Sequence, residues 1–167
     1  MYGQQGMGMG MGQPGMGQPG MGMGQPGMGG VCSYSPMAGH IIKLQAAQTG
    51  NCMTFEGSHL VPRPHMIGNG HQQFKLEPAQ AHPGFFKLVS VHRPDELIRF
   101  CPNMGAGMHD NLRLAPREPG SPNQAWRIEG GRLHPKGHPN MFISINHQTG
   151  RYHCDPMTQG FRIMHVR

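Results

Sequence analysis

Residues 123–128 read NQAWRI and contain the only tryptophan of the chain. In this stretch a glutamine stands two residues before an aromatic residue, which a basic and an aliphatic residue follow. Residues 72–76 (QQFKL) and 159–163 (QGFRI) repeat the pattern. The aromatic and aliphatic residues alternate with the basic one, as in a half-buried strand. Three copies spaced by roughly 35 to 50 residues predict three structural units of a solenoid, a propeller or a pseudo-threefold fold.

The composition indicates one folded domain preceded by a low-complexity tail. Residues 1–30 are almost entirely Gly, Met, Gln and Pro, without a charged side chain, and the phrase GQPGMG starts at positions 12, 17 and 24. Residues 31–39 are interpreted as a linker, and residues 40–167 as a domain long enough for one core. The low charged fraction and the many Gly and Pro favour short strands joined by turns over helices. We therefore expect an all-β domain.

The tail lacks the apolar side chains needed to bury a core of its own, so a flexible segment is its simplest interpretation. However, its phrase recurs in register, and methionine is a flexible, polarizable side chain suited to adaptable contacts. The sequence therefore predicts a homo-oligomer that assembles through the N-terminal tail.

The net charge of +6 is spread over single Lys and Arg residues. Nucleic-acid binding is not expected, because it needs clustered basic residues with exposed aromatic ones. The cysteines Cys32, Cys52, Cys101 and Cys154 form no C-x-x-C pair, and their spacing requires no disulfide. No signal peptide and no run of about 18 apolar residues is present. These features predict a cytoplasmic protein without a membrane span; an extracellular location stays open if a signal was removed or secretion is non-classical.

Strand-like segments follow one another along the domain, without any segment of helical period. They are residues 40–44, 52–55, 72–76, 85–91, 97–101, 112–114, 124–126, 132–133, 141–145, 152–154 and 161–166. The segment with Pro62, Pro64 and His65, which leads to residues 68–70, is predicted to be a loop rich in Pro and His. The third unit is expected to open at residues 141–145, because QTG at 148–150 repeats QTG at 48–50.

The sequence resembles a ricin-B-type β-trefoil lectin domain. The resemblance rests on a threefold succession of strand, Thr-Gly turn, strand, long loop and Gln-x-aromatic motif. The resemblance covers about residues 40–167. It implies a short barrel capped by hairpins, with three units meeting on an axis. The motif residues are expected to be structural, with each glutamine bonding loop backbone and each ring filling the core. They are Gln72, Phe74, Gln124, Trp126, Gln159 and Phe161.

The resemblance also implies one shallow sugar pocket per unit, with an acidic residue soon after the cysteine of the second strand and an aromatic platform. Thr54 stands where the first unit would need the acid, whereas Asp155 directly follows Cys154. The loop of the second unit offers the best remaining set of polar side chains. The candidate carbohydrate-binding residues are Asn103, His109, Asp110, Asn111 and Asp155.

Two other functions stay open at this point. One is a structural protein in which trefoil and tail build a filament or coat. The other is a His-rich trefoil of the hisactophilin type, which binds actin or membranes in a pH-dependent way. The present sequence resembles that type only in its abundance of histidine, of which it has twelve. The histidines form no metal-ligand pattern, the carboxylates form no catalytic pair, and no glycine-rich phosphate-binding motif follows a strand. Neither a cofactor, a metal nor an enzymatic activity is therefore expected.

Overall fold

The computed structural model describes residues 38–103, 111–157 and 159–166, and these are almost entirely β-structure. The expectation of an all-β domain is confirmed. Two single-turn 3-10 helices, η3 (Gly70–Gln72) and η5 (Pro122–Gln124), interrupt twelve strands. The strands are β1 (Ile41–Ala46), β2 (Cys52–Glu56), β3 (His59–Arg63), β4 (Phe74–Pro78), β5 (Phe86–Ser90), β6 (Glu96–Phe100), β7 (Leu112–Pro116), β8 (Trp126–Glu129), β9 (Arg132–Pro135), β10 (Phe142–Asn146), β11 (Arg151–Asp155) and β12 (Phe161–His165).

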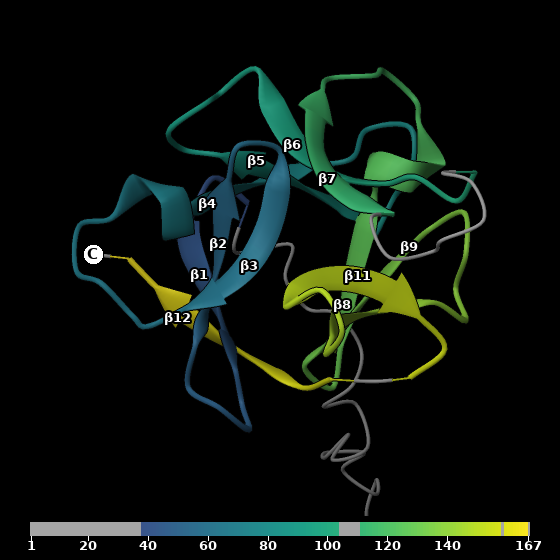
Figure 1. The fold of residues 1–167 in the computed structure, drawn as a ribbon. Coiled ribbons are helices and arrows are strands. Elements are labelled where there is room, and N and C mark those ends of the chain that lie inside the picture. The colour runs from purple at the N-terminus through teal and green to yellow at the C-terminus, as the bar shows by residue number, and fades with distance from the viewer. Residues whose placement is uncertain (1–37, 104–110, 158, 167) are drawn as a thin grey trace, which may run out of the picture.

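Six strands form a closed barrel (Figure 1). β1 pairs with both β12 and β4, β4 pairs with β5, β5 with β8, and β8 with β9. The seam between β9 and β12 is closed where the Phe161 N–H donates to the Gly131 carbonyl at 2.8 Å. All the strand pairs are antiparallel, so short turns suffice to connect them.

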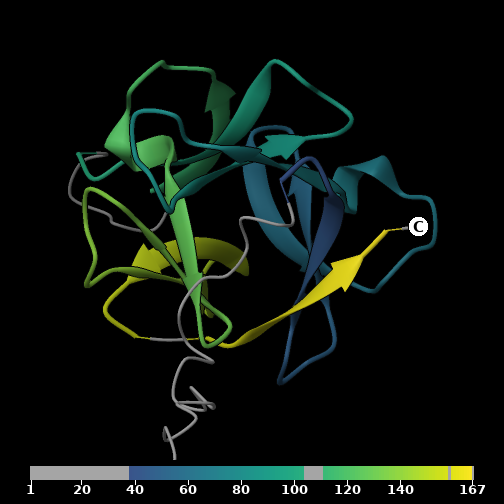
Figure 2. The same cartoon turned by 180° about the vertical axis from the view of Figure 1, so that it is seen from behind.

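The other six strands form three hairpins, β2–β3, β6–β7 and β10–β11. Each hairpin lies between two barrel strands in the sequence, so the chain divides into units β1–β4, β5–β8 and β9–β12. Figures 1 and 2 show the three units arranged around one central axis. This is the barrel capped by hairpins that the sequence predicts.

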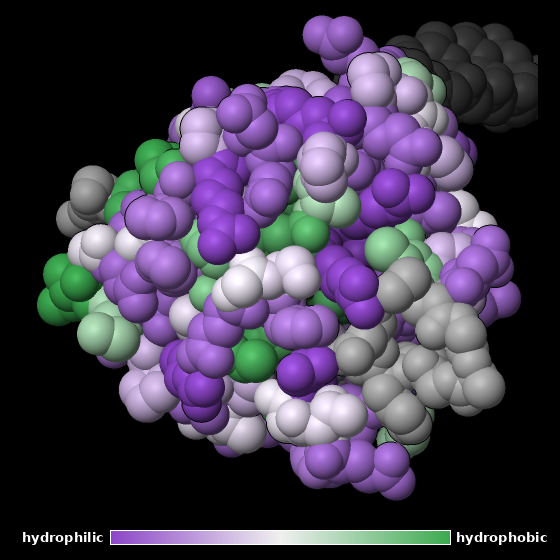
Figure 3. Space-filling model, turned by 45° about the horizontal axis from the view of Figure 1, so that its top comes forward, coloured by the Kyte–Doolittle hydropathy of each residue, from purple (hydrophilic) through white to green (hydrophobic). Residues whose placement is uncertain are grey.

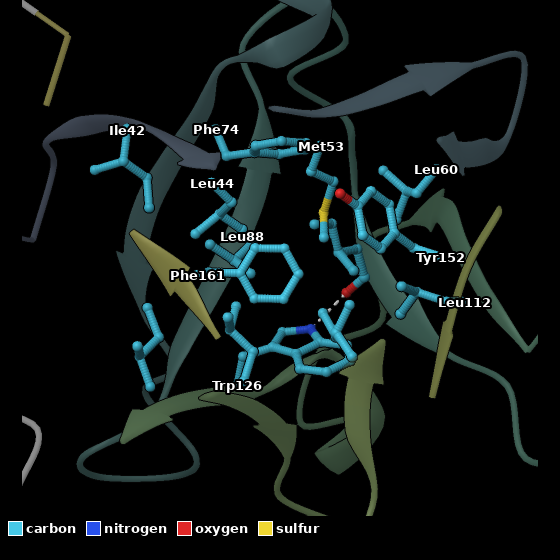
Figure 4. Close-up of a cluster of buried hydrophobic side chains, with 14 of the residues drawn as sticks. Ile42, Leu44, Met53, Leu60, Phe74, Leu88, Leu112, Trp126, Tyr152 and Phe161 are labelled. Carbon is cyan, nitrogen blue, oxygen red and sulfur yellow. Dashed lines mark hydrogen bonds between the residues drawn. The ribbon is translucent and has the colours of Figure 1, made fainter. Parts of the chain in front are cut away.

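The core lies on that axis, where side chains from all three units meet (Figure 4). Phe74, Trp126 and Phe161, the three aromatic motif residues, are all buried there. The indole N–H of Trp126 donates to the Ile98 carbonyl at 2.9 Å, which satisfies its one polar group. Trp126 is thus a core residue rather than an exposed platform.

Two of the motif glutamines bond the loop before them in the same way. The side-chain oxygen of Gln72 accepts from the Met66 N–H at 2.9 Å, and its amide donates to the Pro64 carbonyl at 2.8 Å. Gln124 repeats both bonds with Glu118 and Pro116, at 2.8 Å and 2.7 Å. The partners lie six and eight residues before the glutamine in both units, so the two glutamines hold their loops by equivalent bonds.

Two expectations about the elements are wrong. β3 extends into the segment predicted to be a loop, and Pro62 belongs to the strand, although proline cannot donate to a sheet ladder. The third unit opens with β9, so the QTG turn at 148–150 connects the second and third strands of its unit, whereas the turn at 48–50 connects the first and second. The two QTG turns are therefore not equivalent.

Cys52 and Cys154 are fully buried, as expected of small apolar side chains, and Cys101 is half-buried; all three are free thiols. None of the helices among residues 38–103, 111–157 and 159–166 has the length and apolar character needed to cross a membrane. The tail, at residues 1–30, lies outside the described residues.

Candidate functional site

Pockets occupy equivalent positions in the first and third units, beside the first strand of each hairpin and the end of the second. In the first unit, Arg63 pairs with Cys52 at the start of β2. In the third, Asp155 pairs with Phe142 at the start of β10. Counting along the hairpins from these pairs makes Ser144 the counterpart of Thr54, and each of these residues lines the pocket of its unit.

The third-unit pocket has a volume of about 220 Å³. Polar side chains predominate in its lining. The residues are Gln48, Ser144, Ile145, His147, Asp155, Met157 and Gln159.

Two buried polar atoms at this pocket have no hydrogen-bond partner among the described residues, namely Ser144 Oγ and Gln159 Oε1. Ser144 is 6% exposed and Gln159 is 7% exposed. A buried polar group without a partner costs about 1–3 kcal/mol, unless a water molecule or a ligand bonds it. Both atoms are suited to a ligand that carries hydroxyl groups.

The length of the loop explains why Gln159 lacks the bonds of Gln72 and Gln124. The residues six and eight positions before Gln159 are His153 and Arg151, and both belong to β11. Their backbone groups face β10 in the hairpin instead of forming a loop around the glutamine. Because the connection from β11 to β12 is short, Gln159 has no loop to bond, and its Oε1 is left without a partner among the described residues.

Asp155 is held in place at the edge of the same pocket. Its Oδ1 accepts from the Met157 N–H at 2.8 Å, and its Oδ2 lies 2.8 Å from His153 Nε2. A carboxylate can accept about four hydrogen bonds, so capacity for a ligand remains. Of the candidate residues that the sequence predicts, Asp155 is the one that the structure places in a pocket.

The first-unit pocket is larger, about 710 Å³, and its charged groups are already paired. Arg63 donates to both carboxylate oxygens of Glu56, at 2.6 Å and 2.9 Å, and these bonds lower the pKa of Glu56. The His71 ring stacks on Phe55 with centroids 4.5 Å apart. The side chains of Met66 and Ile67 are exposed at the rim, so this pocket offers apolar contact rather than free acceptors.

The second unit presents a different arrangement at the equivalent place. When the hairpins are aligned on Pro64 and Pro116, whose carbonyls accept from the motif glutamines, Arg99 is the counterpart of Thr54. Arg99 pairs with Glu118 at 3.1 Å. Asn103 is exposed, and His109 and Asp110 lie outside the described residues. Of the predicted set in the second unit, the structure therefore describes Asn103 and Asn111.

Asn111 has a role that the sequence analysis did not predict. It is 2% exposed, its amide donates to the Cys154 carbonyl at 2.8 Å, and its oxygen accepts from the Cys154 N–H at 2.7 Å. With both side-chain groups occupied, Asn111 connects the second and third units instead of lining a pocket. The expectation that it contacts a ligand is corrected accordingly.

Sequence reasoning missed Ser144, Gln48 and His147, and assigned Gln159 only a structural role. The wrong opening of the third unit hid Ser144, because it placed the second strand at residues 152–154 instead of β10. One signal was present, since the short stretch between Cys154 and Gln159 leaves no room for the loop that Gln72 and Gln124 bond.

No protein-family model and no curated protein matches this sequence. Solved structures do match. The C-half of an earthworm R-type lectin in complex with GalNAc is 14% identical, with a TM-score of 0.56 over 76% of this chain and 99% of that one. The fold is that of a ricin-B-type β-trefoil.

Two further trefoil matches come from longer chains. An endo-β-galactosidase from Clostridium perfringens that releases GlcNAcα1-4Gal has a TM-score of 0.64 at 14% identity, over 77% of this chain. The bitter gourd (Momordica charantia) homologue of type II RIPs, non-toxic and in complex with α-methyl-D-galactoside, has a TM-score of 0.58 at 7% identity, over 76% of this chain. The present chain covers 33% of the first and 48% of the second. At these identities the likeness shows the fold alone.

Proposed function

We propose that this trefoil is a non-enzymatic carbohydrate-binding module, and that its principal site is the third-unit pocket. The observation that carries the proposal is the pair of buried acceptors, Ser144 Oγ and Gln159 Oε1, which have no hydrogen-bond partner in the described part of the chain and lie at the same pocket as the fixed carboxylate of Asp155. The R-type lectin among the structural neighbours supports the same class of function.

A sugar ring matches this arrangement chemically. One hydroxyl donates to Gln159 Oε1 and a neighbouring one to Asp155, while the Ser144 hydroxyl both donates and accepts. Ile145 and Met157, the latter 73% exposed, supply apolar contact for the C–H face of the ring. Since drug-sized ligands occupy about 300–1,000 Å³, a pocket of about 220 Å³ suits a single monosaccharide.

The first measurement is a glycan array with the full-length protein, followed by titration calorimetry with the sugars that bind. Galactose and GalNAc are the first probes, because two structural neighbours are complexes with α-methyl-D-galactoside and GalNAc. Q159L is expected to weaken binding about three- to tenfold, the loss of one hydrogen bond. The control Q80L changes an exposed glutamine outside the pocket and should bind as the native chain does. Equal affinity of Q159L and the native chain would contradict the site.

Self-association through residues 1–30 and a cytoplasmic location stay predictions from the sequence. A variant without residues 1–30 belongs in the same array. Saturable, sugar-competed binding by both forms would make the tail an accessory that supplies avidity. If neither form binds any glycan on the array, the proposed lectin function is wrong. Electron microscopy for filaments would then test structural assembly.

A further inference from the structure

Lys43 on β1 is a cation in a buried position, with only 3% of its surface exposed. Its neighbours Ile42 and Leu44 point into the core, so alternation along the strand directs Lys43 to the outside of the barrel. Its ammonium donates to the Met66 carbonyl at 2.5 Å, in the segment before η3. Lys43 is therefore covered by chain that packs over the barrel wall.

The ammonium of Lys43 can donate to more acceptors than the described protein groups supply. It has three N–H donors, and the Met66 carbonyl is the one acceptor found for it among the described residues. No described carboxylate forms an ion pair with it. The charge and the remaining donors of Lys43 are therefore available to an anionic ligand that enters the space beside it.

Lys43 lines a pocket of about 240 Å³. Ile67, Met164 and Val166 supply apolar walls, while the side chains of Gln73, His65 and His165 add polar groups. The low polarity of the walls strengthens the attraction between the ammonium and an anion. From this geometry we propose that the Lys43 pocket binds a small oxyanionic group, such as a carboxylate, a sulfate or a phosphate.

The pocket is separate from the third-unit pocket, so the proposal does not depend on the proposed function. It adjoins the first-unit pocket, and the two share Ile67 and Gly68 in their linings. An oxyanion at Lys43 is therefore either a free ion or the acidic group of a ligand that extends across Ile67.

The test is calorimetric titration of the full-length protein with sodium acetate, sulfate and phosphate, at constant ionic strength against chloride. The native chain should show saturable binding of at least one of these anions. K43M, which keeps the length of the side chain and removes the charge, should weaken that binding at least tenfold. The control K75M removes the same charge from a half-exposed lysine on neighbouring β4 and should bind as the native chain does. Equal anion binding by K43M and the native chain would overturn the proposal.

Stability separates this role from a structural one. If Lys43 serves an anion, K43M without ligand should be as stable as the native chain or more stable, because an unpaired buried charge is gone. If Lys43 only holds the segment around Met66, K43M should unfold at lower urea concentration and keep the native response to anions. Comparing variants also removes the general stabilising effect of sulfate, which acts on both.

A second variant keeps the proposal testable if K43M does not fold. Met164 lies directly opposite Lys43 on β12, so M164E places a carboxylate beside the ammonium. We expect M164E to fold and to abolish anion binding by occupying the site from within. Titration with galacturonic acid and with galactose then identifies the source of the anion. If galacturonic acid binds more strongly than both acetate and galactose, the ligand is an acidic sugar. If galacturonic acid and acetate bind equally, the ligand is a free ion.

Discussion

One residue type serves two purposes in this trefoil, because the loop before it varies in length. Gln72 and Gln124 each satisfy two backbone groups of a long loop. Gln159 follows a short connection and keeps an acceptor without a partner. The first two stabilise the fold, and the third is available for a ligand.

This difference predicts that the same substitution, glutamine to leucine, costs more stability at position 124 than at position 159. Q124L leaves the Glu118 N–H and the Pro116 carbonyl without their partner, and we expect it to lower the free energy of unfolding by about 1–3 kcal/mol. Q159L removes a buried acceptor that has no partner and should change stability by less than about 1 kcal/mol. Urea unfolding measures both. A larger loss in Q159L than in Q124L would contradict the assignment.

Trp126 provides a second prediction at the scale of the residue. W126F removes part of a fully buried ring and leaves the Ile98 carbonyl without its donor. The expected loss is about 1–3 kcal/mol in the free energy of unfolding, from the cavity and the lost hydrogen bond together. Because W126F also removes the only tryptophan, circular dichroism rather than fluorescence should follow its unfolding.

The sequence predicted the residues whose role depends on their own motif, but not those whose role depends on a distant strand. The aromatic motif residues are buried, and alternation along the strand indicates which face is buried. Asn111 bonds a residue 43 positions away, and Lys43 is covered by a segment 23 positions away. Neither contact has a local signature.

Among the elements, the seam between β9 and β12 leaves no room for a side chain at Gly131. Gly131 has a φ of 77°, and a Cβ added there would lie 2.8 Å from the Phe161 carbonyl oxygen. Gly130, with a φ of 56°, has open space at the same position. A side chain at 131 would therefore push the last strand away from the barrel.

G131A and G130A form a matched pair that tests this seam. Both place alanine in the left-handed region, which costs roughly 1–2 kcal/mol. G131A adds the clash with β12, so we expect it to cost about 2 kcal/mol more than G130A in the free energy of unfolding. Similar stability of the two variants would show that β12 adjusts without loss.

The elements that sequence analysis misplaced share a physical cause. β3 contains Pro62 and a half-buried His59, and neither residue type favours a strand; pairing with β2 along its whole length overrides that preference. β9 has only four residues, which is too short for a clear alternation of apolar and polar side chains. The sequence pattern therefore indicates the more regular β10 as the start of the unit. Tertiary pairing decided both elements.

At the scale of the whole molecule, buried cysteine thiols and a buried tyrosine hydroxyl make the stability of the fold depend on pH in the alkaline range. Burial raises the pKa of the Cys52 and Cys154 thiols and of the Tyr152 hydroxyl. At a pH between the ordinary pKa and the raised one, each group is neutral in the folded protein but ionised in the unfolded chain. Their contribution to stability is complete below the ordinary cysteine pKa of 9.0 and is lost as the pH rises above it.

We therefore expect the urea midpoint of the domain to fall between about pH 9 and pH 11. C154A should show a smaller fall over this interval than the native chain, although it will be less stable at pH 7 because of the cavity it leaves. A midpoint that stays constant up to pH 11 would contradict the expected contribution of these groups.

The pairing of β1 with β12 has a mechanical consequence. Ile42 lies opposite His165 and Ala46 lies opposite Phe161, so the start of the first strand is next to the end of the last. A force that pulls these two ends apart acts along the direction of the hydrogen bonds between the strands. The bonds then break one after another, as in a zipper, instead of sharing the load in shear. This domain should yield to a small force at its ends, however well its core resists urea.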